Sequence, residues 1–235
     1  MRILKEPFLY QLTFFKNGLS VNCYIVEEEE ELVLIDTAVP EAFSDIMEAA
    51  STINKPVTKI VLTHAHHDHT GGLDLIKQAL PGAMVYIPDR EVRLLAGDLT
   101  LNPDEPDSPI RGVIPKNIKT KADVLIKDND RIGSLLALST PGHTPGSMSF
   151  VDTRNQALIA GDAFQTEGCT AVAGQLCPSF PYPARGTWDN KIAIASARKL
   201  YALLPSILAT GHGPMIKSPE MVMKQAIEEA ELNEQ

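Results

Sequence analysis

The sequence contains no hydrophobic run long enough to cross a membrane, because no apolar stretch approaches the roughly 18 residues that mark a spanning helix. Residues 1–15 also lack the pattern of a secretory signal peptide, in which a basic start is followed by a continuous apolar core and a small-residue cleavage site. From these absences we expect a cytoplasmic protein with no membrane partner.

Cysteine is scarce as well. The three cysteines, Cys23, Cys169 and Cys177, are too few for a disulfide framework, and their odd number fits a reducing cytoplasm. Cys169 and Cys177 could pair with each other or lie near a bound metal, because both closely follow Asp162. Two ordinary free thiols are the interpretation that typical cytosolic usage favours.

The chain has fewer basic than acidic residues: 21 lysines and arginines against 30 aspartates and glutamates, which gives a net charge of −9. This balance would repel a phosphate backbone, so we expect a small-molecule substrate and no nucleic-acid partner. The chain also lacks the G-x-S-x-G, P-loop and G-x-G-x-x-G motifs, so nothing supports a serine nucleophile or a nucleotide-binding loop. Nothing in the sequence indicates an oligomeric state.

Short hydrophobic segments alternate with amphipathic ones along the chain. Strands are expected at residues 8–15, 21–26, 32–35, 59–62, 83–87, 135–138, 157–160 and 206–209, and another from residue 124. Asn17-Gly18 supplies a turn signal between the first two strands. Helices are expected at residues 40–53, 72–80, 89–96, 187–204 and 219–232. This order predicts two sheets packed together and flanked by helices, in a single domain over residues 1–235.

Two proline-containing segments interrupt the pattern. Residues 97–121 hold four prolines and few periodic apolar residues, and we expect them to form an insertion or lid. Residues 166–185 hold Phe180 and Tyr182 among three more prolines, and we expect them to form a pocket loop. Irregular loops of this length in a compact domain are usually functional or disordered, so these two are expected to decide substrate specificity.

Histidine is concentrated in the segment His64-Ala65-His66-His67-Asp68-His69 and at two later positions, His143 and His212. The segment directly follows one expected strand, and His143, Asp162 and His212 each follow another. Glycine stands beside each of these three later residues, where the backbone must turn sharply or pack closely. Ligands on strand-end loops of a rigid scaffold are typical of a catalytic site.

The donors suffice for two metal ions. His64, His66 and His143 would supply three nitrogens and leave one tetrahedral position open, as in catalytic zinc sites. Asp68, His69 and His212 would hold a second ion, and Asp162 would bridge the two. Imidazole with carboxylate suits zinc, while iron or manganese are alternatives. His67 is out of phase with the ligands, and Asp36 is expected to hydrogen-bond the histidine loop.

These residues resemble the metallo-β-lactamase-fold superfamily. The H-x-H-x-D-H stretch matches residues 64–69, the later single ligands match His143, Asp162 and His212, and Leu34-Ile35-Asp36-Thr37 resembles the strand end that precedes the motif. The resemblance runs from about Asn22 to Gly213. It implies an α+β fold, a four-layer αββα sandwich of two mixed sheets flanked by helices, with the metals at one edge.

Within that superfamily, an aspartate at position 162 resembles glyoxalase II and the lactonases more than the true β-lactamases. About twenty residues follow Gly213, so the carboxyl-terminal helical region by which glyoxalase II helps hold glutathione is not apparent. Acyl-homoserine lactonases carry a tyrosine where this chain has Gln165, and flavodiiron proteins carry a glutamate where it has His66.

We therefore predict a zinc-dependent hydrolase with a binuclear site that cleaves a small carboxylic ester, thioester or lactone. Asp68 and Asp162 are the predicted catalytic carboxylates: Asp162 would bridge the ions, and Asp68 could return the proton to the leaving group. A mononuclear iron enzyme like the persulfide dioxygenases, a β-lactam hydrolase and a non-enzymatic metal-binding protein are the alternatives.

Overall fold

The computed structural model describes residues 1–16 and 18–234, and the chain divides into two compact units. Unit 1 comprises Met1–Gly97 and Ile114–Ile126, and unit 2 comprises Asp98–Val113 and Lys127–Gln235. The expected lid at residues 97–121 is thus shared between the units, with its first part in unit 2. The single domain over residues 1–235 and the roles of the two loops stay predictions.

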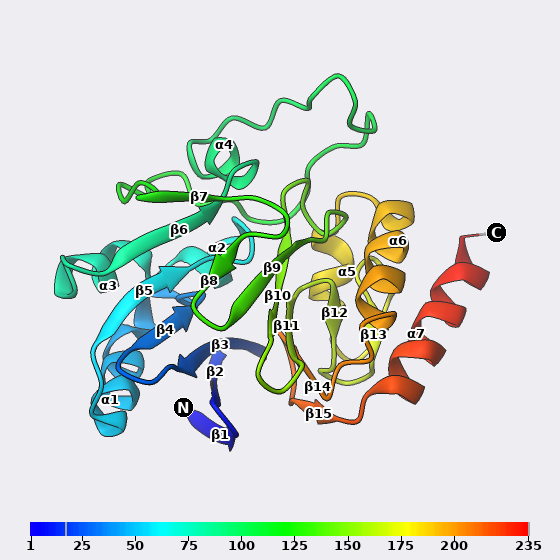
Figure 1. Ribbon diagram of the computed structural model, residues 1–235. Helices are drawn as coiled ribbons and strands as arrows, with labels where there is room; N and C mark the ends of the chain where they lie inside the picture. The colour runs from blue at the N-terminus through cyan, green and yellow to red at the C-terminus, as the bar shows by residue number, and fades with distance from the viewer. Residues whose placement is uncertain (17, 235) are drawn as a thin grey trace. The chain divides into compact units, whose positions relative to one another are not determined.

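Unit 1 is built on a seven-stranded mixed sheet whose strand order follows the sequence (Figure 1). Its strands are β1 (Arg2–Glu6), β2 (Leu9–Lys16), β3 (Leu19–Glu27), β4 (Leu32–Ile35), β5 (Val57–Val61), β6 (Met84–Pro88) and β7 (Val124–Ile126). Strands β1 to β4 pair antiparallel through short connections, whereas β4 to β7 pair parallel and need longer crossovers. Asn17, one residue of the predicted turn, lies outside the described residues.

The crossovers of unit 1 carry short helices. They are η1 (Pro40–Ala42), α1 (Phe43–Ile53), α2 (His67–Thr70), α3 (Leu73–Ala79) and α4 (Glu91–Leu95). Helix α1 buries Ile46, Ala49 and Ala50, which share one face at helical spacing, and it ends where Asn54 adopts a left-handed conformation with φ of 59°. The sequence predicted every one of these helices except α2, which begins inside the histidine motif.

Unit 2 is built on a six-stranded sheet in the order β15-β14-β11-β10-β9-β8. Its strands are β8 (Arg131–Ile132), β9 (Leu135–Ser139), β10 (Met148–Asp152), β11 (Ala157–Gly161), β14 (Ile207–Thr210) and β15 (Ile216–Lys217), and a separate hairpin pairs β12 (Phe164–Gln165) with β13 (Ala171–Val172). Strand β11 pairs parallel with β14 and antiparallel with β10, so this sheet is also mixed. Strands β10 and β11 are buried along their whole length, as expected of central strands covered on both faces.

The helices of unit 2 are α5 (Tyr182–Gly186), α6 (Asn190–Tyr201) and α7 (Glu220–Asn233). Helices α6 and α7 contact each other, side by side in Figure 1, and their buried residues join the sheet in one hydrophobic core. Asp189 caps α6, because its side chain accepts a hydrogen bond of 2.9 Å from the backbone N–H of Ile192. Two mixed sheets, each with its own helices, confirm the predicted α+β class.

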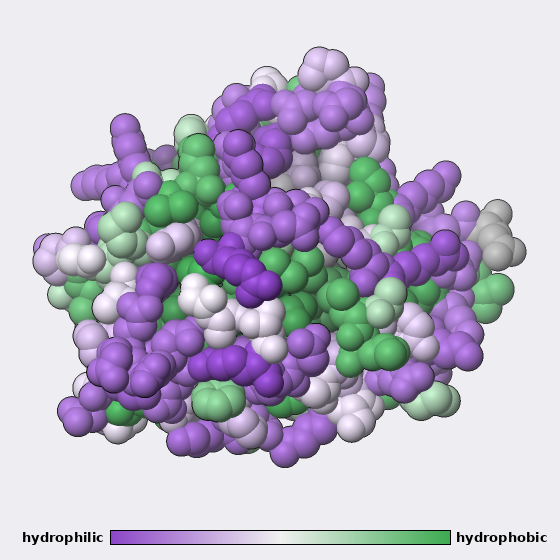
Figure 2. Space-filling view, viewed as in Figure 1, coloured by the Kyte–Doolittle hydropathy of each residue, from purple (hydrophilic) through white to green (hydrophobic). Residues whose placement is uncertain are grey.

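The exposed surface mixes polar and apolar groups. Figure 2 shows one face of the molecule, on which hydrophilic residues surround smaller patches of hydrophobic ones, as on ordinary globular proteins. Within residues 1–16 and 18–234, no helix combines the length and the apolar character needed to span a bilayer.

Candidate metal centre

The first pair of predicted ligands lies in the loop after β5 of unit 1. His64 and His66 are both buried, and the Nε2 atom of His64 lies 3.1 Å from the Nδ1 atom of His66. Two ligands about 2.1 Å from one tetrahedral ion would be about 3.4 Å apart, so this spacing fits donors to a shared cation. A tight loop after β5 therefore brings these two histidines together.

Thr63 fixes the tautomer of His64. The Thr63 hydroxyl donates its single proton to Oδ2 of Asp36 at 2.7 Å, and its oxygen lies 2.9 Å from Nδ1 of His64. Because a hydroxyl has only one proton, the Thr63 oxygen must accept from the Nδ1–H group of His64. The Nε2 atom of His64 is then a lone-pair donor, the form that binds metal.

The second pair lies on the short helix α2. Asp68 Oδ2 lies 4.0 Å from His69 Nε2, with the His69 side chain fully buried and the Asp68 side chain 25% exposed. Nδ1–H of His69 donates to Oδ2 of Asp36 at 2.8 Å, which leaves His69 Nε2 as the atom that can bind metal. His67 is half-buried, like Asp68, and its exclusion from the ligand set stays a prediction.

Asp36 organises this loop, as the sequence analysis expected. It ends β4 in a left-handed conformation with φ of 59°, and its Oδ1 atom accepts a hydrogen bond of 2.8 Å from the backbone N–H of Thr63. Together with its contacts to the Thr63 hydroxyl and His69, one buried carboxylate thus orients two histidine rings.

Glu91 is a positioning residue that the sequence analysis missed. It lies on α4, is fully buried, and its Oε2 atom accepts a hydrogen bond of 2.7 Å from the backbone N–H of Ala65. Ala65 stands between the two histidines of the first pair, so this bond holds the loop that carries both. The signal available in the sequence was that Glu91 lies on the same helix face as Leu94 and Leu95, which is the buried face.

Replacing Glu91 with leucine is expected to lower metal affinity by about tenfold, the size typical for residues that support metal ligands. The glutamine variant should keep near-normal affinity, because its amide oxygen can still accept from Ala65. Metal affinity is measured by competition with a chromogenic chelator, and circular dichroism checks the fold. Equal affinities for the leucine and glutamine variants would show that the hydrogen bond does not position the histidines.

The third histidine, His143, lies in unit 2 in the loop after β9. Its predecessor Gly142 has φ of 135°, and a Cβ atom there would lie 2.4 Å from the backbone of Ala193, so the loop can approach α6 only with glycine. The Thr187 hydroxyl donates to the carbonyl of Pro183 at 2.8 Å and lies 3.0 Å from Nδ1 of His143. The Thr187 oxygen therefore accepts from His143, and Nε2 of His143 is left as a lone-pair donor.

Asp162 lies between the two histidines of unit 2. Its Oδ2 atom is 3.3 Å from Nε2 of His143 and 3.2 Å from Nε2 of His212, and all three side chains are buried. Since Nε2 of His143 carries no proton in the tautomer assigned above, it faces the carboxylate oxygen as one acceptor faces another. Two acceptors this close repel each other unless a proton or a metal cation lies between them, and imidazole nitrogens beside a carboxylate oxygen are a donor set that suits a metal ion.

His212 follows β14 and is held from two sides. The backbone N–H of Thr166 donates to the carbonyl of His212 at 2.9 Å, and a Cβ atom on Gly213, whose φ is 98°, would lie 2.2 Å from the backbone N of Glu167. The Phe180 ring packs against the His212 ring, with centroids 5.2 Å apart. The predicted pocket loop thus contacts a predicted ligand.

Three aromatic residues of unit 2 divide between two roles. Phe180 packs on His212 and Tyr182 packs on Phe180, with ring centroids 5.1 Å apart. Trp188 is structural: its indole N–H donates to the carbonyl of Ser108 at 2.7 Å, and its backbone N–H donates to the carbonyl of His143 at 3.0 Å.

The interpretation of Cys169 and Cys177 as free thiols is wrong, because the two form a disulfide. Their Cα atoms lie 6.0 Å apart, since the β12–β13 hairpin returns the chain on itself, and this spacing is in the range that disulfides span. Cys23 is free and buried.

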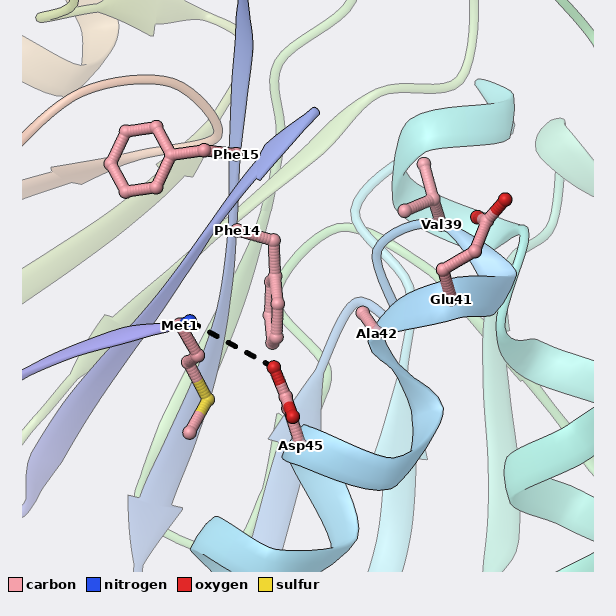
Figure 3. A pocket seen from close by; sticks show the side chains of 7 residues that line it. All are labelled: Met1, Phe14, Phe15, Val39, Glu41, Ala42 and Asp45. Carbon is pink, nitrogen blue, oxygen red and sulfur yellow. Dashed lines mark ion pairs between the residues drawn. The ribbon is translucent and has the colours of Figure 1, made fainter. Parts of the chain in front are cut away.

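A pocket of about 270 Å³ lies elsewhere in unit 1 (Figure 3). It is lined by Met1, Phe14, Phe15, Val39, Glu41, Ala42 and Asp45. The ring of Phe14 points into the space between the chain start and η1, and Phe15 points away from it. None of the lining residues is a histidine, so this pocket lacks the imidazole donors of the predicted metal site.

Comparison with known proteins places all seven predicted ligands inside one family match. The family model of the metallo-beta-lactamase superfamily matches residues 17–212. The uncharacterized protein YobT of Bacillus subtilis (strain 168) is 52% identical over 98% of this chain and 99% of its own length. The probable metallo-hydrolase YflN of the same organism is 31% identical over 84% of this chain and 83% of its own length. A hydroxyacylglutathione hydrolase of Bartonella henselae is 34% identical over 53% of this chain and 41% of its own length.

Solved structures share the fold. The crystal structure of DIM-1 metallo-beta-lactamase aligns with a TM-score of 0.74 at 17% identity, over 99% of this chain and 97% of that one. The crystal structure of TTHA1623 in a di-iron-bound form aligns with a TM-score of 0.66 at 25% identity, over 89% of this chain and 95% of that one. These likenesses confirm the predicted metallo-β-lactamase-like fold.

Proposed function

This chain belongs to the metallo-β-lactamase superfamily, and on that premise we propose that it is a binuclear metallohydrolase acting on a small carboxylic ester, thioester or lactone. The superfamily match, the metallo-hydrolase relative and the histidine–aspartate donor sets support a metal-dependent hydrolase. The number of ions, their identity and the substrate class are the further steps of the proposal.

The observation that carries the proposal is the position of Asp162 between His143 and His212, with one carboxylate oxygen within 3.3 Å of both Nε2 atoms. We propose that His143 completes the first ion's ligands with His64 and His66, and that His212 completes the second ion's ligands with Asp68 and His69. Asp162 would bridge the two ions, which explains why a single oxygen serves both histidines of its unit.

When bound, such an ion pair polarises a substrate carbonyl and lowers the pKa of a shared water toward about 7. The chain's own residues prepare the site for this chemistry. Thr63, Asp36 and Thr187 set the tautomers of three histidines, so that their Nε2 atoms carry lone pairs. The partly exposed Asp68 can take up a proton and return it to the leaving oxygen or sulfur.

The substrate class is proposed from the relatives and from the wall of the site. A hydroxyacylglutathione, named in one relative, is a thioester, and esters and lactones present the same electrophilic carbonyl. In unit 2, the Phe180 ring beside His212 would offer an apolar contact to a small acyl group. The net charge of −9 supports a small-molecule substrate over nucleic acid.

Zinc is the proposed metal, since three imidazoles with an open position suit it, and iron is the alternative that the di-iron form of TTHA1623 raises. We also propose that the protein acts in the cytoplasm without a membrane partner. The scarcity of cysteine supports that location, and the Cys169–Cys177 disulfide is then unusual.

The proposal is tested by assaying the purified protein on a panel of esters, thioesters, lactones and a chromogenic β-lactam, with metal quantified in the same sample. The expected result is about two ions per chain and hydrolysis of at least one carbonyl substrate other than the lactam. Preference for the lactam would favour a β-lactamase. One iron per chain with oxidation of a persulfide would favour a dioxygenase, and metal binding with no turnover on any substrate would favour a binding protein.

A further inference from the structure

A disulfide closes the segment that leads to Phe180 in unit 2. Cys169 and Cys177 are eight positions apart, on either side of β13, and lie between the β12 strand and the residue that packs on His212. Their environments differ, because Cys169 is exposed to solvent and Cys177 is buried. One sulfur is thus accessible to a small reagent while the other is shielded.

The buried cysteine connects directly to the aromatic wall of the proposed site. The backbone N–H of Phe180 donates to the carbonyl of Cys177 at 2.9 Å, and the buried Phe180 ring lies 5.2 Å from the His212 ring between centroids. A shift of Cys177 would therefore move the residue that covers a predicted ligand.

The other ties across this segment are weaker than a covalent bond. The buried Gln165 side chain donates to the carbonyls of Glu167 and Phe180 at 3.3 and 3.2 Å, near the long end of the hydrogen-bond range. The segment closes tightly at Gly168, where a Cβ atom would lie 2.2 Å from Oγ of Ser179. Breaking the disulfide would leave only hydrogen bonds and packing, among them the long bond from Gln165, to hold Phe180 in place.

We propose that Cys169 and Cys177 form a reversible dithiol–disulfide couple whose oxidised state holds Phe180 against His212. Disulfides of cytosolic proteins are usually transient and redox-sensing, which fits the proposed location. The evidence for the dithiol–disulfide couple comes only from contacts within unit 2. Any effect of the couple on hydrolysis rests on the proposed function.

The oxidant is a low-molecular-weight disulfide, RSSR. The exposed Cys169 thiol loses its proton to solvent, and its thiolate attacks RSSR to give a mixed disulfide and one RS⁻. Cys177 then loses its proton and attacks Sγ of Cys169, forming the protein disulfide and releasing the second RS⁻. Two protein thiols are oxidised, RSSR is reduced, and the two released protons yield two RSH; excess RSH reverses both steps.

Cys23 is an internal control for this chemistry. It lies on β3 of unit 1, is fully buried, and burial raises the pKa of its thiol well above the usual value. A thiol that is neither ionised nor accessible does not exchange with RSSR.

The experiment equilibrates the full-length, zinc-loaded protein with mixtures of reduced and oxidised glutathione, blocks thiols with an alkylating reagent in denaturant, and counts labels by mass spectrometry. The wild type should pass reversibly from one labelled cysteine, Cys23, to all three. The Cys23→Ala control should pass from none to two, whereas Cys169→Ser should keep two labelled cysteines throughout. A wild-type count that does not change with the glutathione ratio would overturn the couple.

The link to Phe180 is tested separately, in a buffer without thiols. Thermolysin cleavage before Leu176, a side chain that is 64% exposed, is compared between the oxidised wild type and Cys169→Ser. Cleavage should be about tenfold faster in the serine variant, because local opening no longer has to break a covalent tie. The Cys23→Ala control should match the wild type. Equal cleavage of the wild type and Cys169→Ser would overturn the claim that the disulfide orders this segment, and neither measurement requires that the hydrolase substrate be known.

Discussion

Asp162→Ala is expected to lower kcat/KM on the best substrate by about 10³-fold, because removing a carboxylate that bridges two ions, as proposed, would forfeit several kcal/mol of transition-state stabilisation. The physical reason is the placement of one Asp162 oxygen within 3.3 Å of the Nε2 atoms of both His143 and His212. Without that oxygen, two buried imidazoles lose the negative charge that makes their site attractive to a cation.

The fold should survive this substitution. Asp162 follows the last residue of β11, and the strand itself is stabilised by pairing with β10 and β14. Steady-state kinetics, metal content and far-ultraviolet circular dichroism are measured on the same preparation. The matched Asp162→Asn variant, which keeps one carbonyl oxygen as a neutral ligand, should retain more metal than the alanine variant. Near-normal turnover by Asp162→Ala with an intact spectrum would rule out the bridging role.

Removing metal is expected to have the second large effect, on both activity and stability. Dialysis against a chelator should abolish hydrolysis, and readdition of zinc should restore it. Metal at about 1,000 times its Kd stabilises the folded state by about 4 kcal/mol, so the metal-free protein should unfold roughly 10 °C lower. Metal that binds the folded chain and not the unfolded one stabilises only the folded state, so removing it lowers the unfolding temperature.

Calorimetry of the zinc-loaded, chelated and reconstituted forms measures this shift. His67→Ala is the matched control, because His67 is a histidine of the same segment that is not among the predicted ligands, and the variant should bind metal like the wild type. The dependence on metal would be refuted by a chelated protein that keeps its turnover and its unfolding temperature.

Most secondary structure was predictable because its signals are local. The hydrophobic run of β4 and the helical spacing of Ile46, Ala49 and Ala50 identify their elements without reference to the rest of the chain. Strand β10 was not predicted, since Met148–Asp152 is buried on both faces and shows no alternation. Helix α2 was missed because four residues are too few for a periodic pattern to be visible.

The sequence by itself determined the family of this protein and the donor atoms on which the proposed chemistry depends. Closely spaced histidines and glycines around His143, Asp162 and His212 identify the donors, because metal binding demands particular atoms at the ends of strands. Only the tertiary structure decided how those donors are held. The bonds from Glu91 to Ala65, from Asp36 to His69 and from Thr187 to His143 join positions 26, 33 and 44 residues apart, and no local pattern encodes such pairings. The pairing of Cys169 with Cys177 likewise followed from the β12–β13 hairpin and not from the cysteine count, because chain geometry sets which thiols meet.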